Sequence, residues 1–270
     1  MTVPDNKRRL NWTLTEVETA RLRNGVSARS TRKITVEDID VLFQPIVDLT
    51  VGKLRAVEAL VRCRWPEYLN PEVFINKAVD EGTVGRLGRQ IREVAFHRCR
   101  NVPIFINVHP QELSSRWLVR PDDPLCFHGN NVFVEIIESA AFQYFDLCSS
   151  VLKEVCSRTG AKLVVDDLGA GYSNLKRVID LHPDVVKIDR ALVHGLDTNR
   201  RQRILFYHVV KMCKELGAKV VAEGIESVDE LKAVRDGGAD YGQGFLLARP
   251  GYPIPVPVWP CETKTLNRNG

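Results

Sequence analysis

The sequence has no C-x-x-C pair, no long apolar run and no strong charge imbalance, and each absence excludes a class of protein. Its seven cysteines are scattered and odd in number, which disfavours structural zinc and indicates reduced thiols, as in a cytoplasmic protein. No run of about 18 apolar residues is present, so we expect no membrane span. Residues 1–12 lack the apolar stretch of a signal peptide.

The charge balance is only mildly positive, with 38 Lys and Arg against 34 Asp and Glu. This excess is too weak to indicate a DNA-binding protein, although it suits a small anionic ligand. The chain has 270 residues, of which 44% are hydrophobic, enough for a sizeable core. An α/β barrel needs roughly 250 residues as a single domain, so the length fits that architecture.

The two ends of the chain differ in composition from the middle. Residues 1–36 are polar and basic, and we interpret them as a solvated arm or linker; the alternative is a docking segment for a protein partner. Prolines recur from Pro250 to Pro260 and predict an extended C-terminal tail over residues 253–270. The folded domain is therefore expected to span residues 37–252.

Eight short apolar runs lie in this middle region: VLFQPIV, RAVEALV, IFINV, VFVEII, LVVD, VVKI, KVVA and YGQGFLL. Most are joined by segments with the apolar spacing of helices, and alternating strands and helices predict a parallel sheet. The first two runs are joined only by DLTVGKL, too short for a crossover helix, so this pair is expected to be antiparallel. We predict an α/β fold, a modified TIM-type (β/α)8 barrel with an antiparallel first strand.

Polar residues interrupt these apolar runs at or near their carboxyl ends, where barrel enzymes gather their catalytic groups. They are Glu58, Asn107, Glu135, Asp166, Lys187, Glu223 and Gln243. Strand parity places five of them on the same face as an apolar residue two positions earlier, namely Phe105, Phe133, Val164, Val185 and Val221. If these apolar side chains point inward, the polar ones converge on one mouth of the barrel.

The side chains in this set are hard oxygen donors apart from Lys187, and they would repel one another without cations. Such donors suit magnesium, manganese or calcium rather than zinc. The adjacent Asp166 and Asp167 offer a bridge between two ions about 3.5–4 Å apart, an arrangement that serves phosphodiester cleavage. Lys187 could orient an attacking water or offset charge that develops on a phosphate.

A Gly-x-Gly sequence after the two aspartates, in LGAGYSNL, suggests a dinucleotide-binding fingerprint as an alternative. Asn174 stands where that fingerprint needs its third Gly or Ala, and the two aspartates would repel a pyrophosphate. We therefore interpret the glycines as a sharp turn beside the predicted metal site.

Together these motifs resemble the EAL domain family, the cyclic di-GMP phosphodiesterases of bacteria. The resemblance runs from about residue 38 to residue 250 and rests on QPI at 44–46, EALVR at 58–62, DDLGAGYS at 166–173, KID at 187–189, AEGIE at 222–226 and QGF at 243–245. It implies a modified barrel and hydrolysis of cyclic di-GMP to linear pGpG with two Mg²⁺ or Mn²⁺ ions, Ca²⁺ being inhibitory. It also implies a homodimer formed through the helix after Ser173.

The resemblance assigns roles to individual residues. The first metal would be held by Glu58, Asn107, Glu135 and Asp166, and the second by Asp166, Asp167 and Glu223. Lys187 would contact the attacking water, and we group it with Asp167 and Glu223 as catalytic. The substrate would be bound by Gln44, Leu60, Arg62 and Gln243, and Glu138 would anchor the loop after Asp167.

The sequence departs from the family pattern at Cys63, His109, Ile137 and Leu168, none of which is a metal ligand in the family. His109 could reach the rim of the site or be an exposed loop histidine.

Two further functions remain open. A degenerate EAL domain would bind cyclic di-GMP or a partner protein without turnover, although the expected acidic ligands are all present. An unrelated magnesium-dependent barrel enzyme would not explain the QPI, EAL and QGF motifs.

Overall fold

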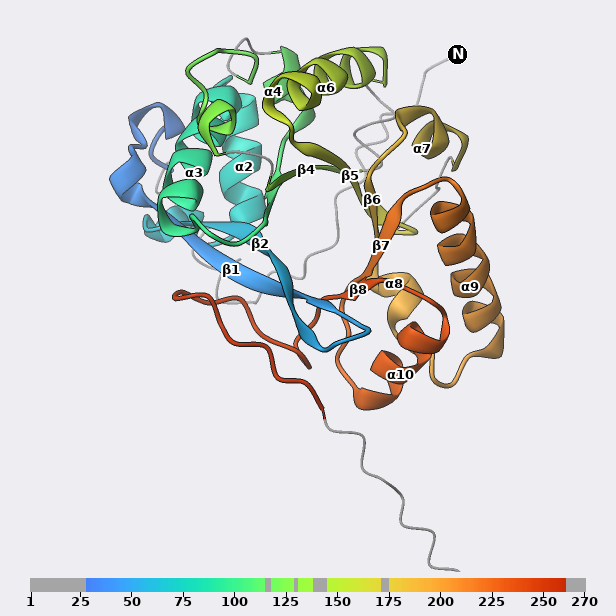
Figure 1. Ribbon diagram of the computed structural model, residues 1–270. Coiled ribbons are helices and arrows are strands. Elements are labelled where there is room, and N and C mark those ends of the chain that lie inside the picture. Colours follow the sequence, from blue (N-terminus) through green and yellow to red (C-terminus); the bar gives the residue numbers. More distant parts are fainter. Residues whose placement is uncertain (1–27, 115–117, 129–130, 138–144, 171–174, 261–270) are drawn as a thin grey trace, which may run out of the picture.

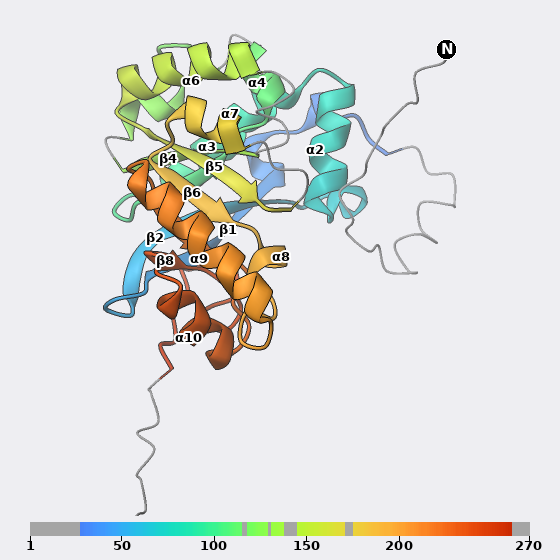
Figure 2. The same ribbon diagram turned by 90° about the vertical axis from the view of Figure 1, so that its right-hand side faces the viewer.

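The computed structural model describes residues 28–114, 118–128, 131–137, 145–170 and 175–260. Its strands form a closed barrel in chain order, with helices around the outside (Figures 1 and 2). The strands are β1 Ile39–Asp48, β2 Lys53–Cys63, β3 Ile104–Asn107, β4 Val132–Ile137, β5 Lys162–Leu168, β6 Val185–Ile188, β7 Lys219–Ala222 and β8 Tyr241–Gly242.

The first strand runs against both of its neighbours, and the remaining pairs are parallel. β1 and β2 form a hairpin whose turn includes Gly52 at φ +67°, a backbone conformation that favours glycine. No crossover helix fits into so short a connection. The predicted barrel with an antiparallel first strand is therefore confirmed.

Helices and 3-10 turns connect the strands and cover the outside of the barrel. The helices are α2 Pro71–Asp80, α3 Val84–Arg98, α4 Pro110–Ser114, α6 Phe145–Thr159, α7 Leu175–Leu181, α8 Arg190–Val193, α9 Arg200–Glu215 and α10 Val228–Asp236. The 3-10 turns are η1 Thr31–Lys33, η2 Val36–Asp38, η3 Pro66–Tyr68 and η4 Pro124–Phe127. Within the described residues, no helix has the length and hydrophobicity to cross a membrane.

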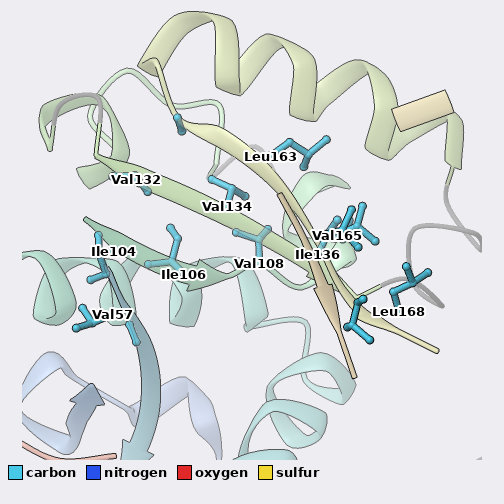
Figure 3. Packing of buried hydrophobic residues seen from close by; sticks show 14 of the residues in the cluster. Val57, Ile104, Ile106, Val108, Val132, Val134, Ile136, Leu163, Val165 and Leu168 are labelled. Carbon is cyan, nitrogen blue, oxygen red and sulfur yellow. The ribbon is translucent and has the colours of Figure 1, made fainter. Parts of the chain in front are cut away.

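Side chains alternate between two hydrophobic clusters because successive residues of a strand point to opposite faces. One face of β3, β4 and β5 packs against the helices, and Figure 3 shows residues of that cluster such as Ile106, Val134 and Val165. The opposite face fills the barrel interior with Ile46, Ala56, Phe105, Phe133, Val164, Val185 and Val221. The five residues that strand parity predicted to point inward all belong to this interior cluster.

The segment before the barrel lies against α2 and α3. Arg29 pairs with Glu67 at 2.6 Å, and its guanidinium lies over the ring of Trp65. The backbone N–H of Thr31 donates to Glu81 at 2.8 Å, and Thr31 and Ile34 are buried. Residues 28–36 of the predicted arm therefore contact the barrel, while residues 1–27 are outside the described part of the chain.

The C-terminal segment adds a further pairing to β1. Gly251 forms an antiparallel bridge with Phe43, whereas β8 pairs only with Val47 and Asp48 of β1. Further along, the indole of Trp259 occupies the space beside Gly52, where a Cβ would lie 2.6 Å from the ring. From Pro253 to Pro260 this proline-rich segment contains no helix or strand, and residues 261–270 of the predicted tail lie outside the described part of the chain.

Candidate active site at the carboxyl ends of the strands

A buried lysine forms the centre of the polar cluster at the barrel mouth. Lys187 has 1% of its side chain exposed, and its Nζ lies near carboxylates from four other strands or strand ends. The distances are 2.7 Å to Glu223, 2.9 Å to Glu135, 3.1 Å to Asp166 and 3.5 Å to Glu58. The polar residues predicted to converge from β2, β4, β5, β6 and the end of β7 therefore lie together.

Amide side chains from β1, from the end of β3 and from the residue after β8 surround Glu58 of β2. Gln243 Nε2 donates to Glu58 Oε2 at 2.7 Å and to Gln44 Oε1 at 3.1 Å. Asn107, whose side chain is exposed at the mouth, donates through Nδ2 to Glu58 Oε1 at 3.1 Å. Gln44 in turn donates to the carbonyl of Ala248 at 3.3 Å. These contacts fix the orientation of the Glu58 carboxylate.

The two adjacent aspartates both face the cluster because β5 is irregular at its end. The β5–β6 register shifts between Val165 and Leu168, and Asp167 adopts φ +60°. A simple strand would point Asp166 and Asp167 to opposite faces. Here one oxygen from each of these aspartates and one from Glu223 all lie within 4.8 Å of one another. Three carboxylates this close together could supply oxygen ligands to one divalent ion.

The electrostatics of the cluster show a deficit of positive charge. Burial raises the pKa of Glu135 and of Glu223 well above the usual value, and it raises the pKa of Asp166 as well. Burial and the neighbouring Asp166 charge raise the pKa of Asp167 to about 7. Burial alone would lower the pKa of Lys187, but the carboxylates outweigh it and hold that pKa well above its ordinary range. The ammonium is therefore charged.

The donor set fits divalent cations on two observations. Both carboxylate oxygens of Glu135 are buried and accept no aligned hydrogen bond within the described residues, although Lys187 Nζ lies 2.9 Å from Oε1. Unsatisfied buried oxygens are costly, and a bound cation would remove that cost. The donors are carboxylates and amides, with hard oxygens that suit magnesium, manganese or calcium.

The remaining sequence-predicted residues fall into two groups. Leu60 and Arg62 follow Glu58 at two-residue steps on β2 and are half-buried towards the mouth. His109 is half-buried; its Nδ1 accepts the N–H of Gln111 at 3.2 Å, and burial lowers its pKa. Glu138 and residues 171–174, which come directly before α7, lie outside the described residues.

A second buried ionic cluster was not predicted. Arg92 on α3 makes two bonds to Asp123, at 2.7 and 3.0 Å, and one to Glu112 at 2.8 Å. Glu112 also accepts the backbone N–H of His109 at 3.1 Å, which ties the loop after Asn107 to α3. These residues come from separate elements, so no spacing in the sequence indicates that they meet.

Comparison with known proteins shows which family the chain belongs to. The family model described as "EAL domain" matches residues 28–250. The chain is 30% identical to cyclic di-GMP phosphodiesterase PdeR of Escherichia coli K12, aligning over 83% of this chain and 35% of that protein. It is 31% identical to probable cyclic di-GMP phosphodiesterase PdeB of the same organism, over 78% and 42% of the two chains.

Solved structures share the fold. A manganese and cyclic di-GMP complex of Klebsiella pneumoniae BlrP1 at pH 6 matches with a TM-score of 0.69 and 28% identity, over 83% of this chain and 58% of that one. The PaMucR phosphodiesterase in complex with c-di-GMP matches with a TM-score of 0.72 and 24% identity, over 87% and 97% of the two chains. The chain spans less than half the length of the curated relatives named above. It belongs to the EAL domain family.

Proposed function

We propose that the chain is a metal-dependent phosphodiesterase that hydrolyses cyclic di-GMP to linear pGpG. The observation that carries the proposal is the single cluster in which Lys187 contacts four carboxylates at the barrel mouth. The relatives PdeR and PdeB are named as cyclic di-GMP phosphodiesterases, and the BlrP1 structure holds manganese with cyclic di-GMP. Both facts support the same substrate and the same class of cofactor here.

The proposed metal ligands divide into two sets that share one aspartate. Glu58, Asn107, Glu135 and Asp166 would hold one ion, and Asp166, Asp167 and Glu223 the other. When bound, two divalent cations supply the positive charge that activates water and stabilises charge on the phosphodiester. The two ions are proposed to be Mg²⁺ or Mn²⁺. Ca²⁺ has a looser coordination, which supports binding better than turnover.

The chain's own residues would position the reactants. Lys187 is charged and buried, so it can donate to the attacking water and offset charge on the phosphate, while its high pKa makes it a poor general base. The water oxygen bonds to phosphorus, the bond from phosphorus to the 3′ oxygen breaks, and that oxygen takes a proton. Gln44, Leu60, Arg62 and Gln243 would bind the dinucleotide.

The test is to incubate the protein with cyclic di-GMP and magnesium and to separate the products by ion exchange. We expect pGpG with Mg²⁺ or Mn²⁺, little product with Ca²⁺, and none in excess chelator. Glu135→Gln should abolish turnover, whereas Glu215→Gln, an exposed site on α9, should not. Full activity in chelator would contradict the metal assignment.

The alternative function is a receptor that binds cyclic di-GMP, or a protein partner, without turnover. Calorimetric binding of cyclic di-GMP in calcium, together with no pGpG in magnesium, would establish it. We favour the enzyme because the acidic donors are all present in one cluster. The scattered free thiols suit a reducing compartment, so the cytoplasm is the proposed location.

Assembly is a separate proposal. From the family resemblance we propose a homodimer that pairs through α7, the helix after Ser173, and a protein partner for the basic N-terminal arm. Pairing there would couple the second subunit to the loop after Asp167. Glu138→Ala should then lower activity without removing a metal ligand. Sedimentation that shows only monomers with full activity would contradict the dimer.

A further inference from the structure

Glu230 is a buried carboxylate outside the metal-donor set, and it gathers four hydrogen-bond donors. Its Oε1 accepts from His194 Nδ1 at 3.0 Å and from the N–H of Gly195 at 3.3 Å. Its Oε2 accepts from the N–H groups of Glu226 at 2.9 Å and Ser227 at 3.1 Å. Only 5% of the side chain is exposed. A helix cap needs fewer bonds than this, because the capping box uses only the Ser227 pair.

These donors come from two different loops. His194 and Gly195 follow α8, in the connection that leaves β6 after Lys187. Glu226 and Ser227 lie in the connection that leaves β7 after Glu223. Figure 1 shows α8 and α10 as neighbours below the barrel. Glu230 therefore joins the loops that follow two residues of the cluster.

The same two loops also touch closer to the barrel. Gly224 has φ +68°, and a Cβ there would lie 2.5 Å from Cγ of Arg190. The Arg190 guanidinium pairs with Glu226 at 3.2 Å. The β6–β7 ladder itself ends where Glu223 N–H donates to the carbonyl of Ile188 at 3.0 Å. Beyond that bond, the Glu230 contacts continue the connection between the loops.

The distance between these two loops affects the position of Glu223 within the cluster. Glu223 Oε1 lies 2.7 Å from Lys187 Nζ, the shortest of the four ion-pair distances there. Glu223 is also the member of the Asp166, Asp167 and Glu223 triad that comes from a different strand. Glu223 lies three residues before Glu226 in the chain, so movement of the loop after β7 would shift the Glu223 carboxylate relative to both aspartates.

We propose that Glu230 is a positioning residue for Glu223. By holding the loop after β7 against the turn after α8, it fixes the distance from Glu223 to Lys187 and to the two aspartates, and thereby sets the divalent-ion affinity of the triad. This inference rests on the proposed function for the identification of the triad as a metal site.

The test compares Glu230→Gln with Ser227→Ala in the full chain, using calcium binding by calorimetry, thermal unfolding, and kcat and KM for cyclic di-GMP. The glutamine amide would face backbone N–H groups with its own donors, so at least one loop is released. We expect calcium affinity to fall about tenfold, as measured for groups that orient metal ligands, and kcat to fall more than KM rises.

Ser227→Ala is the matched control because its hydroxyl accepts the N–H of Glu230 at 3.1 Å and so caps α10 without joining the loops. It should lower the melting temperature and leave calcium affinity unchanged. Equal losses of calcium affinity in the two variants, or wild-type affinity in Glu230→Gln, would overturn the proposal.

His194→Ala covers the case in which Glu230→Gln fails to fold, since its side chain is 65% exposed and its loss removes a single donor. It should weaken calcium binding less than Glu230→Gln does, and unchanged affinity would count against the proposal. A wild-type protein that binds calcium but yields no pGpG would refute the proposed turnover, while the calcium comparison would still decide the role of Glu230.

Discussion

Lys187→Ala separates the two roles that a lysine at this position could have, as an ion-pair partner or as a group that acts on the reacting water. Its Nζ lies 2.7–3.5 Å from four carboxylates. A contact near 3 Å is worth roughly 5 kcal/mol of attraction at an effective dielectric of about 20, and the cost of burying the charges offsets much of it. Removing one partner of a buried ion pair costs about 3–5 kcal/mol.

We therefore expect Lys187→Ala to lose about 3–5 kcal/mol of unfolding free energy in chelator, because the carboxylates lose their counter-charge. In calcium the loss should be much smaller, since the ions replace that charge. Calcium should bind as tightly as in the wild type or more tightly, because the ammonium no longer competes for Glu135, Asp166 and Glu223. Turnover should fall by 10²-fold or more, equivalent to about 2.7–4 kcal/mol, as for loss of one transition-state donor.

The assay is thermal unfolding with and without calcium, calorimetric binding of calcium and cyclic di-GMP, and magnesium-dependent turnover. Lys219→Ala is the control, because Lys219 pairs with Asp240 at 2.9 Å on the surface at the start of β7. Because the Lys219 side chain is 57% exposed, losing this pair should cost less than about 1 kcal/mol of stability and should leave turnover unchanged. Near-normal turnover in Lys187→Ala would remove Lys187 from the mechanism, and loss of calcium binding would show that its role is structural.

Three further predictions follow from burial and charge. Because the pKa of Asp167 is raised to about 7, calcium affinity should weaken as pH falls through that value; flat affinity from pH 8 to 6 by calorimetry would contradict this. Arg29 lowers the pKa of Glu67 to about 2, so its stabilisation is present above about 4.5 and lost as pH falls towards 2. In denaturant titrations Glu67→Gln should cost less than about 1 kcal/mol at pH 6, and most of that cost should be gone at pH 2. Gly88→Ala should lose about 1–3 kcal/mol or more, because its Cβ would overlap the Glu112 carboxylate; wild-type stability would refute that packing.

The fold was predictable because two periodic signals agree. Alternating strand and helix patterns predicted the barrel, and strand parity predicted which apolar side chains fill it, among them Phe105 and Phe133, whose rings stack at 4.2 Å. The short DLTVGKL connection predicted the antiparallel hairpin. These signals are local, so they can be recognised in the sequence without knowledge of tertiary contacts.

Asp167 shows where parity fails. It has the wrong parity for the barrel interior, and it joins the triad because the β5–β6 register shifts and its φ is +60°. The sequence contains a hint, since Gly169 and Gly171 predict a turn nearby, but it does not state which residue takes the left-handed conformation.

Buried polar contacts between distant elements were the least predictable feature. The sequence Ser227-x-x-Glu230 is a capping-box signature, and the structure contains that box. Nothing in the signature indicates that the same carboxylate reaches His194, 36 residues earlier. Arg92 with Glu112 and Asp123 is a similar case, because helical spacing alone gives Arg92 no partner.

The charges of the cluster bear on the choice between enzyme and receptor. When ionised, the cluster carries five negative charges, on Glu58, Glu135, Asp166, Asp167 and Glu223. Lys187 adds one positive charge, which leaves a net charge of −4 that two divalent cations would balance. Glu135 and Lys187 are the most buried members, at 0% and 1% exposed, while Glu223 is 17% exposed. The negative charge therefore extends towards the mouth, where an anionic dinucleotide would have to enter. Such a substrate would be repelled without bound cations. Metal ions would then be needed for cyclic di-GMP to bind as well as for its cleavage, so a receptor with this intact donor set would also have to bind them, and binding without metal would point to a different site.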